Sequence, residues 1–186
     1  MPLIDHFGIL APLYDRVFKQ ADVELWRNLL NLSGKGLLLD IGGGTGRVSS
    51  GLRQYVRKII VLDESLAMVA EAVKKPGLSG LMARAEKLPI ESNSIDFIIM
   101  VDAFHHLHDQ LKTLEEGVRI LKPGGKIIIE EPDIELFGVK LLALGEKIIL
   151  MRSHFRSAQK ITAFLEKNGV KVESRKQKPN SWVIGE

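Results

Sequence analysis

Five short apolar runs recur along the chain, and segments with the spacing of an amphipathic helix separate them. The hydrophobicity of each run is continuous rather than alternating, as a parallel sheet covered on both faces requires. The runs occupy residues 36–41, 58–63, 80–83, 95–101 and 125–131, and the helical patterns occupy 45–55, 65–75, 111–121 and 157–169. Ser65 is a candidate N-cap, and Pro123-Gly124-Gly125 is expected to stop the third helix. This order predicts an α/β fold with a doubly wound, mostly parallel sheet.

Both ends of the chain depart from this alternation. Residues 5–32 predict two short helices, the second with an apolar face that includes Trp26 and Leu30. The last 17 residues, 170–186, predict two strands that meet at Pro179-Asn180 in an antiparallel hairpin, which brings the predicted sheet to seven strands. Because no repeat, low-complexity tract or linker interrupts the sequence, we expect a single domain over residues 1–186.

Composition narrows the class of protein. The hydrophobic content of 45% and the charged content of 26% are ordinary for a soluble globular protein. The chain has no cysteine, which excludes disulfides, thiolate zinc sites and cysteine nucleophiles. The first residues lack the features of a signal peptide, and no apolar run approaches the roughly 20 residues that span a bilayer. We therefore expect a cytoplasmic protein.

Charge gives little indication of a nucleic-acid partner. The formal net charge is only +3, although the stretch from Arg152 to Glu186 holds eight Lys or Arg against three Glu. This excess is interpreted as a solvated basic face, with an anion-binding surface as the alternative.

A glycine-rich loop follows the first predicted strand. Asp40 and Gly42-Gly43-Gly44-Thr45-Gly46 fall at its carboxyl end, the edge where open α/β sheets bind ligands. A dinucleotide fingerprint would place its third glycine at position 47, which is Arg47, so NAD and FAD are disfavoured. The Gly-Lys-Ser/Thr ending of a P-loop is also missing, which excludes a nucleoside-triphosphate site of the P-loop class.

An acidic residue closes the next predicted strand. Asp63 should point into the same crevice as the loop, and a carboxylate there can accept both hydroxyls of a ribose. Asp40 adds a second negative group, which favours a cationic ligand over a pyrophosphate. The structural alternatives are that Asp40 is a turn residue at a strand end and that Asp63 caps the following helix.

These motifs together resemble class I S-adenosylmethionine-dependent methyltransferases. The stretch "LLLDIGGGTGRVS" is similar to the family's first motif, Asp-x-Gly-x-Gly-x-Gly, and "VLDESLAMV" to its second. Two longer stretches, "ARAEKLPIESNSIDFIIMVDAFHHL" and "LEEGVRILKPGGKIIIEEPD", resemble the later motifs. The segment "FGILAPLYDRVF", residues 7–18, is similar to the N-terminal segment of the ubiquinone/menaquinone-biosynthesis (methyltransferase type 11) branch.

The resemblance implies S-adenosyl-L-methionine as cofactor, with S-adenosyl-L-homocysteine as product, and it implies no metal. It implies that Asp40 and the Gly42 backbone hold the amino-acid end and that Gly44 admits the ribose, whose hydroxyls Asp63 binds. The other cofactor-binding residues that it implies are Gly46, Ala85, Glu86, and Tyr14 near the methyl group. It also implies that Val101 and Asp102, at the end of the fourth strand, face the methionine part of the cofactor. One departure is Arg84, where the family commonly has an Asp that accepts from the adenine amino group; Arg cannot accept.

Three histidines lie just past the fourth predicted strand, in "DAFHHLHD". His105 or His106 is a candidate catalytic base, because imidazole accepts protons near neutral pH. The alternative is that both only hydrogen-bond the loop, and a metal site here is not expected. Glu131 and His154 are weaker candidates for a base.

The expected function is methyl transfer to a small-molecule acceptor, with a lipophilic acceptor as one option. The alternative is a non-catalytic module of the same fold that binds the cofactor or contacts RNA or protein. The expected parts are N-terminal helices at 1–34, a cofactor-binding core at 35–131, a substrate cover at 132–156, and a C-terminal helix and hairpin at 157–186. Residues 136–151 are apolar enough for core packing, for a lid or for contact with a membrane surface. A nucleic-acid substrate is not expected, because the Asn/Asp-Pro-Pro-Tyr/Phe motif is missing after the fourth strand.

Overall fold

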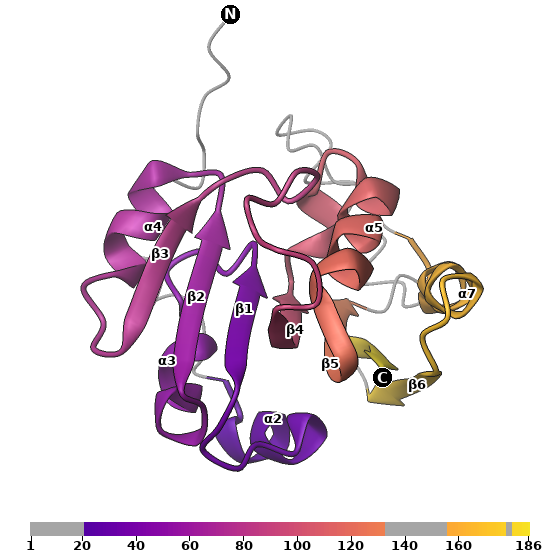
Figure 1. The fold of residues 1–186 in the computed structure, drawn as a ribbon, viewed down its shortest axis with the longest axis horizontal. Coiled ribbons are helices and arrows are strands. Elements are labelled where there is room, and N and C mark those ends of the chain that lie inside the picture. Colours follow the sequence, from indigo (N-terminus) through magenta and orange to yellow (C-terminus); the bar gives the residue numbers. More distant parts are fainter. Residues whose placement is uncertain (1–20, 133–155, 178–179) are drawn as a thin grey trace, which may run out of the picture.

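The computed structural model describes residues 21–132, 156–177 and 180–186. Its centre is a seven-stranded sheet with the strand order β3-β2-β1-β4-β5-β7-β6 (Figure 1). The strands are β1 Leu37–Ile41, β2 Lys58–Asp63, β3 Leu78–Met82, β4 Ile95–Val101, β5 Leu121–Pro132, β6 Val172–Gln177 and β7 Asn180–Gly185. The first five strands pair in parallel, and β7 runs antiparallel to both β5 and β6. The predicted doubly wound sheet with a C-terminal antiparallel hairpin is confirmed.

Strand order reverses at β1, which pairs with β2 on one side and with β4 on the other. The chain leaves β1 toward β2 and later crosses back to β4, so the loops after β1 and β4 diverge and leave a crevice between them. The carboxyl ends of these strands carry Asp40, Asp63 and Val101. The topology thus places the predicted motifs at one edge of the sheet.

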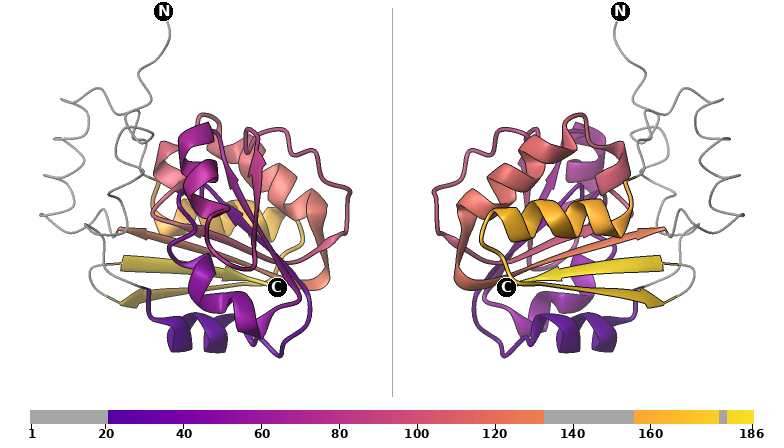
Figure 2. Two further views of the ribbon diagram at one scale, coloured as in Figure 1. Left: turned by 90° about the vertical axis from the view of Figure 1, so that its left-hand side faces the viewer. Right: turned by 90° about the vertical axis from the view of Figure 1, so that its right-hand side faces the viewer.

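Helices cover both faces of the sheet (Figures 1 and 2). One face packs against α5 Gln110–Ile120 and α7 Ala158–Lys167, and the other against α2 Val23–Leu30, α3 Ser49–Leu52 and α4 Leu66–Ala72. Neighbouring residues of one strand pack on opposite faces of the sheet. Leu39 belongs to the apolar cluster on the α5 and α7 face, and Leu38 to the apolar cluster on the α2, α3 and α4 face. This burial on both sides explains why the strands read as continuous apolar runs.

Two predicted boundaries were wrong. The helical pattern at 45–55 is a turn, then the one-turn α3, then the 3-10 helix η1 Arg53–Tyr55. Gly46 has φ +71°, outside helical geometry, and its N–H bonds back to the Gly43 carbonyl. Helix α5 ends at Ile120, within one residue of the prediction, but β5 begins at Leu121 and not at residue 125. Pro123-Gly124-Gly125 therefore lies inside the strand and does not stop the helix, because Leu121 is extended and already pairs with β4.

Other local predictions are confirmed. The Ser65 side chain accepts the Met68 N–H and caps α4. The second N-terminal helix is α2, with Trp26 and Leu30 buried. The residues predicted to form the first N-terminal helix, with Tyr14, lie outside the described residues, as do the apolar segment at 136–151 and His154. No helix in the described part of the chain is long and apolar enough to cross a membrane.

Candidate functional site

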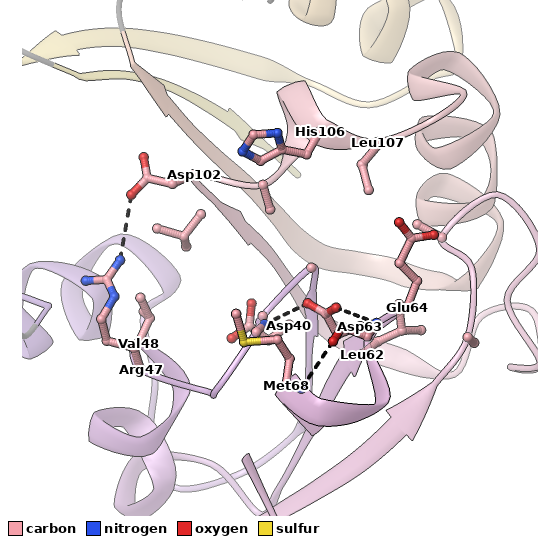
Figure 3. Close-up of a pocket in the computed structure, with 18 of the residues that line it drawn as sticks. Asp40, Arg47, Val48, Leu62, Asp63, Glu64, Met68, Asp102, His106 and Leu107 are labelled. Atoms are coloured by element: carbon pink, nitrogen blue, oxygen red, sulfur yellow. Dashed lines mark hydrogen bonds and ion pairs between the residues drawn. The ribbon is translucent and has the colours of Figure 1, made fainter. Parts of the chain in front are cut away.

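A cleft opens at the carboxyl edge of the sheet, between the loops that follow β1 and β4 (Figure 3). Its space is about 1010 Å³, part of it open to solvent. The loop after β1, the end of β2, the segment after β3 and the segment after β4 all contribute to its lining. Of the residues predicted to bind cofactor, Asp40, Gly42, Gly44, Asp63, Ala85, Glu86 and Val101 line the cleft.

Asp40 is the most deeply buried polar group of the cleft, with 2% of its surface exposed. Its Oδ2 accepts a hydrogen bond from the Ser49 hydroxyl, whereas its Oδ1 has no hydrogen-bond partner among the described residues. Burial raises the pKa of Asp40 to about 7; the Ser49 hydrogen bond opposes this rise, and the negative charge of Asp63 adds to it. A buried acceptor without a donor is costly, so this oxygen suits a ligand that brings one.

The loop requires glycine at different positions for different reasons. A Cβ on Gly42 would lie 2.6 Å from Ala103 Cβ, and one on Gly46 would lie 2.6 Å from Leu78 Cδ1. These two positions therefore need glycine because protein atoms crowd them. Gly44 differs, since a Cβ there would meet only the Met68 sulfur, at 3.7 Å, and the residue lines the cleft. Gly46 does not line it.

Asp63 organises the loop as well as facing the cleft. Its Oδ2 accepts the Gly44 N–H at 3.0 Å, and its Oδ1 accepts the Ser65 N–H at 2.9 Å (Figure 3). The structural alternative, that Asp63 caps the following helix, is wrong: the N-cap of α4 is Ser65, and Asp63 accepts the N–H of that cap residue. A carboxylate has about four acceptor positions, so accepting backbone N–H groups does not exclude a bond from a ligand hydroxyl.

The segment after β3 forms an apolar wall with one acidic group. Ala83 and Ala85 line the cleft, while the side chain of Arg84 is 59% exposed and its Nε lies 3.3 Å from the Glu86 carboxylate. Glu86 also accepts the Asp109 N–H at 3.0 Å. Although partial burial acts to raise it, this backbone hydrogen bond and the Arg84 charge hold the pKa of Glu86 below its usual range. The cleft therefore keeps an ionised acceptor despite the Arg at position 84.

The structure separates the two candidate bases. His106 lines the cleft, whereas His105 is 3% exposed and its Nδ1 lies 2.7 Å from Glu131 Oε2. Glu131 Oε1 accepts the Phe104 N–H at 3.0 Å, so Glu131 braces the 3-10 turn η2 Phe104–His106. Burial and then the nearby His105 lower the pKa of His106 to about 3. His106 therefore faces the cleft as a neutral imidazole and a weak base.

Arg47 and Asp102 face each other across the mouth of the crevice, with 3.7 Å between Nη2 and Oδ2 (Figure 3). Asp102 has φ +51°, a conformation that a non-glycine residue seldom adopts outside functional sites and tight turns. Sequence reasoning gave Arg47 no role in the site. The signal available was its position beside the glycine loop, but its partner is 55 residues away in the sequence.

Comparison of the sequence with known proteins identifies the family of this chain. A family model described as a methyltransferase domain matches residues 39–129. Demethylmenaquinone methyltransferase from Renibacterium salmoninarum is 28% identical over 141 residues, which cover 71% of this chain and 59% of that protein. An uncharacterised protein from Methanocaldococcus jannaschii is 30% identical over 170 residues, which cover 89% of this chain and 80% of that protein. The chain belongs to the class I S-adenosylmethionine-dependent methyltransferases.

Solved structures of this family share the fold. A Haloferax volcanii structure holds a putative methyltransferase in complex with the Trm112 methyltransferase activator. It superposes with a TM-score of 0.82 at 20% identity and covers 98% of both chains. The present chain spans 59% of the length of the Renibacterium relative, so that protein's acceptor does not transfer to it directly.

The residues of the cleft fit S-adenosylmethionine, the cofactor of this family. The Asp40 oxygen that lacks a partner among the described residues suits an ammonium donor, and the Asp63 carboxylate lines the cleft as an acceptor suited to a ribose hydroxyl. Leu62, Ala83 and Leu107 offer apolar surface for a purine ring. Among the described residues, no group of three His, Asp or Glu is placed to hold a metal ion.

Proposed function

We propose that this chain transfers a methyl group from S-adenosylmethionine to a small-molecule acceptor. The observation that carries the proposal is the buried Asp40 carboxylate, which lines the cleft with Gly44 and Asp63 at the switch point of the sheet and has one oxygen without a partner among the described residues. The positively charged sulfonium supplies an electrophilic methyl group when it is bound. The role of the protein is then mainly to orient, desolvate and align, because alignment alone can lower such a barrier by several kcal/mol.

Each part of the cleft has a defined task in this proposal. Asp40 and the loop at Gly42 and Gly44 hold the amino-acid end, Asp63 holds the ribose hydroxyls, and the wall at Ala83 and Ala85 holds the purine. His106, neutral at physiological pH, offers a hydrogen bond to the acceptor. A small acceptor is supported by the recessed, partly apolar cleft, which suits a compact ligand.

Calorimetry with S-adenosylhomocysteine tests the cofactor site. Asp63→Asn should weaken binding about tenfold or more, the scale of a charge-assisted hydrogen bond at roughly 1.5–3 kcal/mol. Asp96→Asn is the matched control, because Asp96 also accepts a backbone N–H, from Leu37 at 2.8 Å, but does not line the cleft. No binding by the native protein at millimolar ligand would refute the proposal.

Activity is tested with S-adenosylmethionine labelled in its methyl group and a cell extract from which protein and RNA have been removed. Transfer of label to a small molecule supports the proposed enzyme. If the protein binds S-adenosylhomocysteine but labels only RNA or protein, the small-molecule proposal fails. Cofactor binding without transfer to any fraction would favour the non-catalytic module.

We also propose a protein partner, because the Haloferax volcanii methyltransferase was solved with an activator. The described part of this chain exposes apolar side chains on α4 and on the edge strand β3 that α4 contacts: Leu66 at 65%, Val73 at 50% and Met82 at 57%. Met82 lies on β3, an edge strand without charged residues, and such edges readily pair with other proteins. Affinity capture with Met82→Lys as the non-binding control tests this; equal capture by both proteins would contradict it.

A further inference from the structure

A second chamber opens beside the cofactor cleft, on the face of the sheet that carries α2. Among the described residues, it is lined by the start of α2, the start of the α3 segment, and the ends of β4, β5 and β7. It shares Arg47, Val48, Val101 and Asp102 with the cofactor cleft. A ligand in this chamber would therefore adjoin the end of β4, where the resemblance places the methionine part of the cofactor.

One side of the chamber is aromatic. Trp26 of α2 and Trp182 of β7 both line it, and their ring centroids lie 5.0 Å apart at an interplanar angle of 53°. Only 2% and 5% of their surfaces are exposed, so both rings are fixed by the packing around them. Leu25 and Val48 extend this apolar wall. A rigid wall of this kind suits a flat apolar group.

An acidic part of the chamber adjoins this wall, because Glu130 of β5 is the register partner of Trp182 of β7. Glu130 of β5 is 8% exposed, and its Oε1 accepts a hydrogen bond from the Asn180 side-chain amide. Asp102 also lines the chamber, and its Oδ2 lies 3.7 Å from Arg47 Nη2. The only cationic side chain in the described lining is thus already matched to a carboxylate, which leaves Glu130 as an excess negative charge.

The groups around Glu130 make a bound cation favourable. Burial raises the pKa of Glu130 to about 7. The Asn180 hydrogen bond and, less strongly, the positive charge of Arg47 oppose this rise, whereas the negative charges of Asp102 and Glu131 add to it. Asp22, at the N-cap of α2, is a further acidic residue of the lining. A cation beside Glu130 would offset both the repulsion between carboxylates and the cost of their burial.

We propose that this chamber binds the methyl acceptor and that the acceptor carries an aromatic ring and a protonated amine. The ring lies against the wall of Trp26 and Trp182, and the ammonium group lies between Glu130 and Asp102. An anionic acceptor would meet the same carboxylates with only Arg47, already paired, to receive it. This inference rests on the proposed function for the chemistry, although the binding site stands on its own geometry.

Two ligands of the same shape and opposite charge test the proposal: phenethylamine and phenylacetate. Each is titrated calorimetrically into the full chain saturated with S-adenosylhomocysteine, at pH 6 and at pH 8. Phenethylamine should bind and phenylacetate should not. Because Glu130 must be ionised to receive the ammonium, and its pKa is about 7, the affinity should be about tenfold higher at pH 8 than at pH 6. Phenylacetate binding as tightly as the amine would overturn the proposal.

Variants assign the effect to Glu130. Glu130→Gln keeps the shape of the side chain and should weaken phenethylamine binding about tenfold at pH 8 while removing its pH dependence. Glu173→Gln is the control, since Glu173 lies on β6, the strand beyond β7 in the sheet, and pairs with Arg175 outside the chamber. Thermal unfolding checks that both variants fold. Unchanged, still pH-dependent binding by Glu130→Gln would overturn the assignment.

Two further titrations, each with one ligand, separate failure of this inference from failure of the proposed function. The native protein is titrated first with S-adenosylhomocysteine alone and then with phenethylamine alone. Binding of the first without the second refutes the amine chamber and leaves the methyltransferase proposal in place. Binding of the second without the first supports the chamber and refutes the proposed function.

Discussion

Alanine substitutions at three glycines with positive φ separate two roles of the glycine-rich loop after β1: packing against the protein at Gly46 and contact with the ligand at Gly44. Gly34, Gly44 and Gly46 have φ of +82°, +55° and +71°, so alanine at any of them incurs the left-handed strain of about 1–2 kcal/mol. Gly34 isolates that strain, because a Cβ there would have nothing within 4 Å. At Gly46, the Cβ would lie 2.6 Å from Leu78 Cδ1 and 3.3 Å from Val61 Cγ2, which adds about 1–3 kcal/mol of overpacking. Gly46→Ala should therefore lose about 2–5 kcal/mol of unfolding free energy, against about 1–2 for Gly34→Ala.

Gly44→Ala should show the opposite pattern. Its Cβ would find only the Met68 sulfur, at 3.7 Å, so its loss of stability should match that of Gly34→Ala. The same methyl group would occupy the cleft, and S-adenosylhomocysteine affinity should fall at least tenfold. Urea unfolding measures stability, and calorimetry measures binding. If Gly46→Ala is no less stable than Gly34→Ala, the steric argument is wrong. If Gly44→Ala binds like the native protein, Gly44 does not face the ligand.

Three further predictions concern charge and support around the cleft. Because the folded pKa of Asp40 is raised to about 7 from 3.8, the unfolded state loses this proton first as pH rises, and stability should fall between about pH 4 and pH 7. Asp40→Asn should remove that loss, a few kcal/mol in scale, so urea unfolding at pH 8 should find the variant more stable even though calorimetry finds weaker ligand binding. The ring resonances of His106 should not titrate between pH 5 and pH 8 in NMR spectra, since its pKa is about 3; a midpoint near 6.5 would contradict its burial. Arg119 donates to the carbonyls of Ile90 at 2.9 Å and Leu88 at 3.2 Å. Arg119→Lys should loosen that segment, cost about 1 kcal/mol of unfolding free energy, and weaken S-adenosylhomocysteine binding by less than Asp63→Asn does.

The sheet could be predicted from the sequence because its strands are buried on both faces. Residues such as Leu38 and Leu39 serve opposite apolar clusters, and that requirement shows directly as an unbroken apolar run. The misplaced boundaries have a tertiary cause. The segment at 45–55 has helical spacing, yet the turn through Gly46 is held by packing against β2 and β3. Leu121 joins β5 because Ile95 of β4 is there to pair with it.

The cleft residues could be predicted only where they follow strand ends. Asp40, Asp63 and Val101 share one edge because parallel strands end there together. A motif cannot distinguish Gly44 from Gly46, since their difference lies in what surrounds each Cβ. Nor can adjacency indicate which histidine enters the cleft, because that depends on the contact between His105 and Glu131, 26 residues apart.

Acidic groups at this edge give the site a pH-dependent preference for positive charge. Burial raises the pKa of both Asp40 and Glu130 to about 7, and in each case another carboxylate adds to the rise. S-adenosylmethionine and S-adenosylhomocysteine differ by one methyl group and one positive charge, so their affinity ratio measures the field at the sulfur. As Glu130 ionises between pH 6 and pH 8, the ratio should shift at least several-fold toward the charged form, because two charges interact by about 1 kcal/mol even at roughly 15 Å with an effective dielectric constant of about 20. Calorimetry of both ligands at the two pH values measures the shift, and Glu130→Gln should reduce it. A ratio that stays constant with pH in the native protein would mean that the sulfur lies beyond the influence of Glu130, and the chamber would then not adjoin the methyl group.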